Sequence, residues 1–156
     1  HLVFSTLHTN DAPSSITRLV NMGTPNYLIS AALTLIMAQR LARKSCLDCR
    51  VIDENITPKL LNSIGFLPEQ SSRAKIYKGT GCEECSGTGY KGRMGIYEIL
   101  EIDNELKAGI LSNLQQTELN AIAKKNGFRT MQDMGQDLLL SGDLSFAEYE
   151  RVLQSN

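Results

Sequence analysis

The four cysteines are the residues whose types and spacing most clearly indicate chemistry. They form two pairs with two residues inside each, Cys46-x2-Cys49 and Cys82-x2-Cys85. Such spacing lets one tight turn direct both sulfurs at a single point, and two turns together supply the four thiolates of a tetrahedral zinc site. The 32 residues from 50 to 81 exceed the separation found in a compact zinc ribbon, so we expect an insert within this site.

Two disulfides, or four unrelated buried thiols, are the alternative interpretation of these cysteines. No secretory or transit signal is visible at the N-terminus, and cysteines paired two by two without an export signal favour a metal site in the cytoplasm. Glycine beside a cysteine turn permits positive φ and lets backbone N–H groups approach the sulfurs. The second pair is surrounded by such residues: Gly79, Gly81, Gly87, Gly89, Gly92 and Gly95.

The polar segment His8-Thr9-Asn10 is the second candidate for chemistry. It follows an apolar run over residues 1–7, which is typical of a strand buried on both faces. Asp11 is a predicted N-cap for the next helix, with Pro13 in its first turn. Ligands of α/β nucleotide-binding folds bind at the carboxyl ends of strands, where this segment would lie. A plain N-cap turn with an unremarkable histidine explains the same residues, and the pattern alone leaves both interpretations open.

A long buried helix is predicted from Thr24-Pro25 to Arg43, because almost every residue in it is apolar or small. Gln39, Arg40 and Arg43 would end it with positive charge, which the helix macrodipole favours. Contact of Gln39 and Arg40 with a nucleotide is the alternative, and the residues alone favour the electrostatic explanation.

Shorter elements are predicted between and after the cysteine pairs. The sequence predicts a short helix from Thr57-Pro58 to Gly65, a loop over 68–72, and strands over 74–77 and 96–100. From Asp103 onward the pattern indicates helices alone. The last of these helices begins with a predicted capping box, Ser145-x-x-Glu148.

The composition of the 156-residue chain narrows the function classes. Lysine plus arginine (16) nearly balances aspartate plus glutamate (17), so no basic footprint for nucleic acid is present. The longest apolar stretch, near residues 28–38, is too short and too polar to span a bilayer. The chain contains no Gly-x4-Gly-Lys-Ser/Thr motif for phosphates, and no apolar strand ending in paired acidic residues for Mg²⁺. Because His1 leads directly into an apolar run, we expect the chain to be the C-terminal part of a longer protein.

The order of these motifs resembles one family. His1-Leu-Val-Phe-Ser-Thr-Leu-His-Thr-Asn-Asp11, Ala38-Gln-Arg-Leu41, the two cysteine pairs and Gly89-Tyr-Lys-Gly-Arg-Met-Gly-Ile96 are similar to the C-terminal part of the type II secretion and type IV pilus assembly ATPases. The resemblance covers nearly the whole chain and is weakest over 50–75 and after 115. Pilus retraction ATPases share the histidine segment and lack the cysteines, so the assembly or secretion branch is favoured.

The resemblance implies an α/β fold with four parts. These are the C-terminal part of a RecA-like core (1–44), an inserted tetracysteine zinc subdomain (45–92), a strand returning to the core (93–102) and a C-terminal helical bundle (103–156). It further implies a cytoplasmic homo-hexamer that uses ATP and Mg²⁺. That assembly would be peripheral to the inner membrane through a membrane platform and the cytoplasmic proteins of the machine.

The resemblance also assigns roles to individual residues. His8 would be the catalytic γ-phosphate sensor or polariser, and zinc would be held by Cys46, Cys49, Cys82 and Cys85. The remaining nucleotide-proximal residues would be His1, Thr9, Asn10, Gln39 and Arg40. Because the phosphate-binding motif is missing, this chain alone is predicted not to hydrolyse ATP.

Two other functions compete with this interpretation. A non-enzymatic zinc adaptor is one, because Cys82-x2-Cys85-x-Gly-x-Gly89 resembles a unit of the DnaJ-type chaperone zinc region; that family repeats the unit, whereas it occurs once in full here. A zinc-ribbon nucleic-acid binder is the other. It would require a basic face and aromatic stacking positions, whereas the net charge is −1 and tryptophan is absent.

Overall fold

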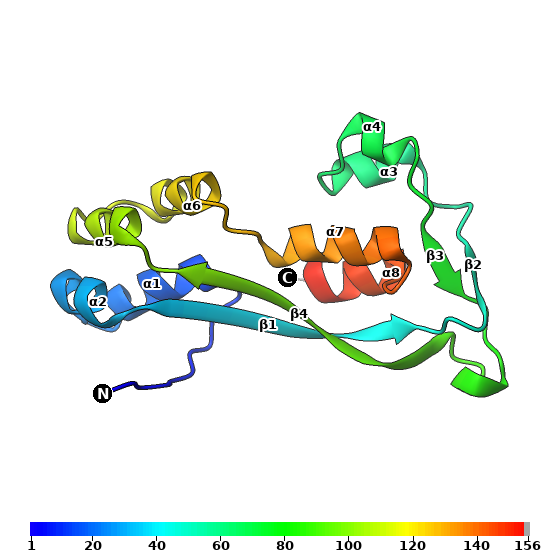
Figure 1. Ribbon diagram of the computed structural model, residues 1–156, viewed down its shortest axis with the longest axis horizontal. Coiled ribbons are helices and arrows are strands. Elements are labelled where there is room, and N and C mark those ends of the chain that lie inside the picture. Colours follow the sequence, from blue (N-terminus) through cyan, green and yellow to red (C-terminus); the bar gives the residue numbers. More distant parts are fainter. Residues whose placement is uncertain (155–156) are drawn as a thin grey trace. The chain divides into compact units, whose positions relative to one another are not determined.

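The computed structural model describes residues 1–154, and their contacts gather into two units. Unit 1 consists of His1–Gln39 and Tyr97–Thr130, and unit 2 consists of Arg40–Ile96 and the chain from Met131 onward. Strands β1 (Leu35–Ser45) and β4 (Tyr90–Glu101) pair in a two-stranded sheet and pass from one unit into the other (Figure 1). The division into four functional segments stays a prediction.

Strand β1 corrects the predicted helix over 24–43. Helix α2 covers only Asn26–Ala32, and the chain then becomes extended. Ile102 N donates to Thr34 O (2.9 Å) and Cys46 N donates to Gly89 O (2.9 Å), so the paired strands run in opposite directions. This pairing joins segments far apart in sequence, and such long-range pairing overrides a local helical pattern.

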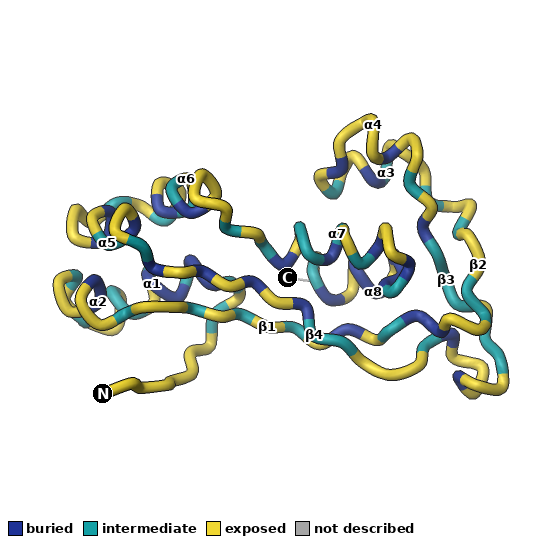
Figure 2. The backbone as a smooth tube through the Cα atoms, in the orientation of Figure 1, coloured by how far each residue is buried: buried dark blue, intermediate teal, exposed yellow. Residues whose placement is uncertain are grey.

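The N-terminal segment is the second correction. Residues 1–7 form no strand, and all of them are exposed (Figure 2). A strand needs a neighbour for its N–H and C=O groups, and no strand in the described part of the chain pairs with this segment.

Unit 1 packs four helices over its portion of the β1–β4 pair: α1 (Ala12–Asn21), α2, α5 (Asn104–Leu111) and α6 (Gln116–Lys125). The predicted start of α1 is confirmed, since Asp11 Oδ1 accepts the N–H of Ser14 at 2.7 Å. Asp103 Oδ1 caps α5 in the same way through Leu106 N (2.8 Å). The core of unit 1 comprises Ala12, Ile16, Ile29, Leu100, Ile102, Leu106, Ile110, Leu119 and Ala123.

Unit 2 contains the insert between the cysteine pairs. Its elements are β2 (Arg50–Ile52), α3 (Pro58–Ser63), α4 (Pro68–Ser71), β3 (Tyr77–Gly79) and the 3-10 turn η1 (Glu83–Cys85). Strands β2 and β3 are antiparallel, with Arg50 opposite Gly79. The predicted cap at Thr57 is confirmed, because its Oγ1 accepts the N–H of Leu60 at 3.3 Å. The loop predicted over 68–72 is instead the helix α4, and the strand predicted over 74–77 begins only at Tyr77.

The last helices of the chain also belong to unit 2. They are α7 (Met131–Ser141), α8 (Phe146–Tyr149) and the continuing π-helical turn η2 (Glu150–Gln154). Gln136 Nε2 of α7 donates to Ile64 O at 2.8 Å, and Arg50 Nη1 donates to Gly142 O at 3.0 Å. The insert between the cysteine pairs is therefore held by α7 and the residue after it, which follow the insert in sequence by more than 40 residues.

Candidate functional site

The four cysteine sulfurs converge on one point of unit 2. Their Sγ atoms all lie within 4.8 Å of one another. Cys46 and Cys82 are 3.8 Å apart, Cys49 and Cys85 are 3.9 Å apart, and Cys82 and Cys85 are 3.7 Å apart. The predicted convergence of the two pairs is confirmed.

These separations fit a metal ion better than disulfides. Four sulfurs placed about 2.3 Å from a zinc ion at tetrahedral angles are about 3.8 Å from one another, whereas a disulfide requires about 2.05 Å. All four cysteines are free, and Cys46 and Cys85 are buried. The donor set is therefore that of a structural four-thiolate metal site.

Backbone N–H groups point at two of the sulfurs, as the local glycines led us to expect. Gly81 N donates to Cys49 Sγ at 3.3 Å, and Cys82 N and Gly89 N each donate to Cys85 Sγ at 3.2 Å. Burial of the Cys85 thiol raises its pKa, but the donors from Cys82 and Gly89 outweigh burial and bring the pKa to about 6. A backbone hydrogen bond from Cys85 lowers the pKa of Cys82, but burial and the thiol–thiol contacts outweigh it and raise that pKa to about 12. Cys85 is therefore the member of the cluster that most readily becomes the thiolate that a metal requires.

Two glycines hold the cysteine turns together by close backbone approach. A Cβ at Gly79 would lie 2.1 Å from Gly89 O, and a Cβ at Gly89 would lie 2.7 Å from Gly79 O. Gly89 also has φ of 77°, which a residue with a Cβ adopts only with strain. Because Gly89 O accepts from Cys46 N and Gly89 N donates to Cys85 Sγ, this glycine links both cysteine pairs.

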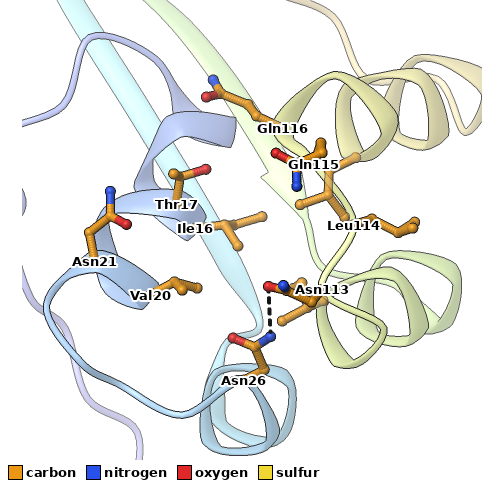
Figure 3. Close-up of a pocket in the computed structure, with 11 residues that line it drawn as sticks. Ile16, Thr17, Val20, Asn21, Asn26, Asn113, Leu114, Gln115 and Gln116 are labelled. Atoms are coloured by element: carbon orange, nitrogen blue, oxygen red, sulfur yellow. Dashed lines mark hydrogen bonds between the residues drawn. The ribbon is translucent and has the colours of Figure 1, made fainter.

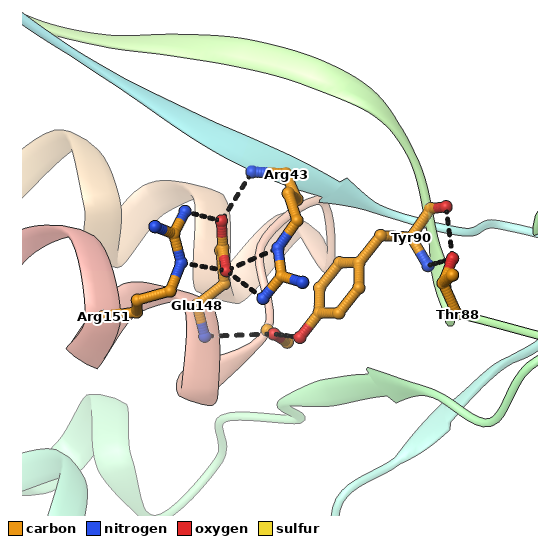
Figure 4. A network of polar contacts seen from close by, with 6 residues as sticks. Arg43, Thr88, Tyr90, Glu148 and Arg151 are labelled. Carbon is orange, nitrogen blue, oxygen red and sulfur yellow. Dashed lines mark hydrogen bonds and ion pairs between the residues drawn. The ribbon is translucent and has the colours of Figure 1, made fainter.

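A buried carboxylate connects the cysteine turns to the last helices of unit 2 (Figure 4). Glu148 of α8 is fully buried, and its Oε2 accepts from Arg43 Nη2 at 2.7 Å and Arg151 Nε at 2.8 Å. The Arg43 guanidinium lies 4.1 Å from the centroid of the Tyr90 ring, and Tyr90 Oη is 3.0 Å from Ser145 Oγ. Arg43 precedes Cys46, and Tyr90 follows Gly89, so both sides of the cluster are fastened to α8.

Of the two hydrogen bonds that the capping box predicted at Ser145 requires, one is confirmed. Ser145 Oγ accepts the N–H of Glu148 at 3.3 Å. The Glu148 carboxylate, however, binds Arg43 and Arg151 instead of returning to the Ser145 backbone. The sequence carried a signal for this role, because Glu148 lies on the same helical stripe as the buried Tyr149 and Val152.

The predicted nucleotide residues of the N-terminal segment lie in unit 1. His1, His8 and Asn10 are exposed and Thr9 is half-buried. Thr9 Oγ1 is 2.8 Å from Ser15 Oγ in the first part of α1. The segment therefore leaves His8 open to solvent and is tied to α1 through Thr9.

Gln39 and Arg40 lie on β1 and not at the end of a helix, which corrects the predicted macrodipole arrangement. Gln39 Nε2 donates to Tyr97 Oη at 3.3 Å within unit 1. Arg40 Nη1 donates to Val152 O at 3.0 Å within unit 2. The boundary between the units falls between these two neighbours, so each is engaged by a partner in its own unit.

Unit 1 also contains a cleft of about 290 Å³ between α1, α2, α5 and α6 (Figure 3). Aliphatic side chains such as Ile16 and Val20 form part of its wall, and Asn26 Nδ2 donates to Asn113 Oδ1 across it at 3.3 Å. Among residues 1–154, the side chains that line the cleft include no lysine or arginine, the residue types that most often bind phosphate.

Within residues 1–154, no helix has both the length and the apolar character needed to cross a bilayer.

Comparison with known proteins identifies the family of this α/β chain, which carries the cluster of four cysteines. A family model described as "Type II/IV secretion system protein" matches residues 1–151. The chain belongs to this family.

Several curated relatives carry names from pilus assembly and secretion. The chain is 42% identical over 148 residues to the type IV pilus assembly ATPase PilB of Thermus thermophilus, covering 95% of this chain and 16% of that protein. It is 42% identical over 157 residues to the type IV pilus assembly ATPase TfpB of Acinetobacter baylyi, covering 98% and 26%. It is 36% identical over 156 residues to the type II secretion system protein E of Aeromonas hydrophila, covering 100% and 30%. The chain thus spans less than a third of the length of these relatives.

Proposed function

We propose that this chain is the C-terminal portion of a cytoplasmic ATPase that powers pilin or pseudopilin assembly in type IV pilus biogenesis or type II secretion. The observation that carries the proposal is the match of residues 1–151 to the type II/IV secretion system family, together with relatives named as pilus assembly ATPases. The proposal includes a RecA-like core, a homo-hexamer, and partners at the inner membrane and in the cytoplasm. It includes no contact with nucleic acid and no direct insertion into the membrane.

In this proposal the four cysteines hold a structural zinc ion. Three sulfur separations of 3.7 to 3.9 Å and a limit of 4.8 Å for all of them support it, and a closed site of four thiolates has no open position for chemistry. The metal would fix the two cysteine turns as one element of unit 2.

His8 is proposed as the residue that senses or polarises the γ-phosphate, with His1, Thr9 and Asn10 supporting the segment. The exposure of His8 and the Thr9–Ser15 contact support this role. Gln39 and Arg40 are proposed as nucleotide-proximal groups, and each would exchange its present partner for the ligand. ATP and Mg²⁺ would be bound mainly by residues of the longer protein outside this chain, because this chain has no Gly-x4-Gly-Lys-Ser/Thr motif.

The test compares ATP turnover by the longer protein with turnover by residues 1–156 alone. We expect the longer protein to hydrolyse Mg-ATP and the chain alone to show none. In the longer protein, His8→Ala should lower kcat more than it changes KM, because a γ-phosphate contact matters most as charge shifts in the transition state. Ser5→Ala, a change in the same exposed segment, is the control and should change neither constant.

A non-enzymatic zinc adaptor is the alternative function, and the four-thiolate cluster alone would serve it equally well. It predicts no ATP turnover by the longer protein. That result, obtained with fully metallated protein, would overturn the proposed ATPase and leave the adaptor.

A further inference from the structure

Glu98 is a carboxylate in a core position of β4. Its exposed fraction is 3%, and it shares a strand face with the buried Leu100. Carboxylates are rarely this buried unless a partner compensates the loss of water. A glutamate that alternates with core residues therefore points to a specific partner.

One such partner is the first residue of α1. Glu98 Oε1 accepts the backbone N–H of Ala12, and Ala12 is itself fully buried. The first N–H groups of a helix have no partner within the helix and carry partial positive charge. Asp11 satisfies a different one, the N–H of Ser14. Two carboxylates thus fasten the start of α1, one from its own N-cap and one from β4.

The start of α1 is also the end of the His8 segment. Thr9 is tied to the buried Ser15 through their hydroxyls at 2.8 Å. Together with the Glu98–Ala12 hydrogen bond, this contact fixes the backbone on the α1 side while His8 stays exposed. Of these two contacts, only the Glu98–Ala12 hydrogen bond involves a residue outside the His8 segment and α1.

We propose that Glu98 is a positioning residue for ATP hydrolysis, acting through the Ala12 backbone to hold the His8 segment in place. This inference rests on the proposed function, in which His8 contacts the γ-phosphate. The role requires an oxygen that accepts the Ala12 N–H and lies as far from the strand backbone as a glutamate side chain extends. Glutamine keeps that reach without the charge, whereas aspartate keeps the charge but is one methylene shorter.

The experiment measures Mg-ATP turnover by the longer protein carrying changes at this position. Glu98→Asp and Glu98→Ala should lower kcat by about ten- to a hundredfold, because a displacement of about 1 Å has effects of this size. KM should change less than threefold, and Glu98→Gln should keep kcat within about threefold of the unchanged protein. Amide exchange at Ala12 should accelerate in Glu98→Asp and not in Glu98→Gln. Glu101→Gln, an exposed carboxylate on the same strand, is the matched control.

A double variant separates this inference from the proposed function. His8→Ala combined with Glu98→Asp should be no slower than His8→Ala alone, since both changes would remove the same contact. If the two effects multiply, or if Gln and Asp at position 98 are equally active, Glu98 does not act through His8 and the inference fails alone. If His8→Ala leaves kcat unchanged, the role proposed for His8 fails and the inference fails with it.

Discussion

Arg43 binds Glu148 with its backbone and its side chain at once. The Arg43 N–H donates to Glu148 Oε1 at 2.7 Å, while Nε and Nη2 donate to Oε2 at 2.9 and 2.7 Å. The backbone contact means that the carboxylate fixes the path of β1 as well as neutralising a cation. Glu148 is fully buried, whereas the side chains of Arg43 and Arg151 are about half exposed, so the arginines compensate a charge that the carboxylate alone has taken out of water.

The first prediction concerns acid stability of unit 2. Burial raises the pKa of Glu148, but the guanidinium groups of Arg151 and Arg43 outweigh burial and lower the pKa to about 2. The pKa of an unfolded glutamate is about 4.3. Because the folded pKa is the lower one, the stabilisation is present above about pH 5 and is lost as the pH falls toward 2.

The measurement is the free energy of unfolding from pH 2 to 7, followed through hydrogen exchange of the α8 amides. Glu148→Gln should lower stability by roughly 3 kcal/mol at pH 7, the amount that corresponds to the pKa shift, and flatten the acid dependence. Glu54→Gln, an exposed carboxylate in the same unit, should leave the profile unchanged. An acid dependence in Glu148→Gln as steep as in the unchanged protein would contradict the assignment.

The second prediction concerns the contact between Gly79 and Gly89. Gly89→Ala should weaken metal binding at least about tenfold more than Gly87→Ala does, because a clash with the Gly79 backbone adds to the strain of positive φ. Gly87 has nearly the same φ (76°) and no atom within 4 Å of its Cβ position. Gly87→Ala therefore reports the strain alone, at about 1–2 kcal/mol. Competition with a chromophoric chelator measures both, and equal affinities would show that the close approach is unimportant.

The third prediction concerns the metal itself. Elemental analysis of protein purified without chelator should give one zinc per chain, and chelation should remove about 10–16 kcal/mol of apparent binding free energy. Amide exchange should then rise across unit 2, including α7 and α8, while α1, α5 and α6 stay protected, since they belong to unit 1.

The cysteine variant and its control test the same point without a chelator. Cys82→Ser should reproduce the exchange pattern of the metal-free protein. Glu83→Gln lies between the paired cysteines and is exposed, so it should keep both the metal and the protection. Unit 2 protection that survives metal loss would refute the structural role of the site.

The fourth prediction concerns Asp103, which caps α5 and accepts from Asn126 Nδ2 at 2.8 Å. Asp103→Ala should destabilise unit 1 by about 1–2 kcal/mol, whereas Asp103→Asn should lose less, because asparagine is an equally good cap. Denaturant titration of α5 exchange measures the difference. Equal losses in the two variants would show that the charge, and not the cap, supplies the stabilisation.

Contacts were predictable from the sequence where a side chain binds residues close to it in the chain. Asp11 and Thr57 cap the helices that their positions indicated. The two cysteine pairs converge because each turn is set by its own spacing and glycines.

Long-range partners were not predictable from local patterns. Leu35 and Met37 were expected inside a buried helix, yet they lie on β1, where they are 49% and 56% exposed. Their strand depends on β4, which is distant in sequence. Glu98 was missed for the same reason, because its significance comes from Ala12, 86 positions away.

The chain leaves one unit for the other three times, after Gln39, Ile96 and Thr130. Each unit is therefore built from two stretches of sequence that are separated by a stretch of the other unit. For chimaeras between relatives this sets a rule: a transplanted cysteine insert folds into its native surroundings only when residues 40–96 and the segment from 131 onward come from the same parent. A single crossover between positions 43 and 148 separates Arg43 from the Glu148 that it binds, and such hybrids should be recovered rarely in a shuffled library selected for folding.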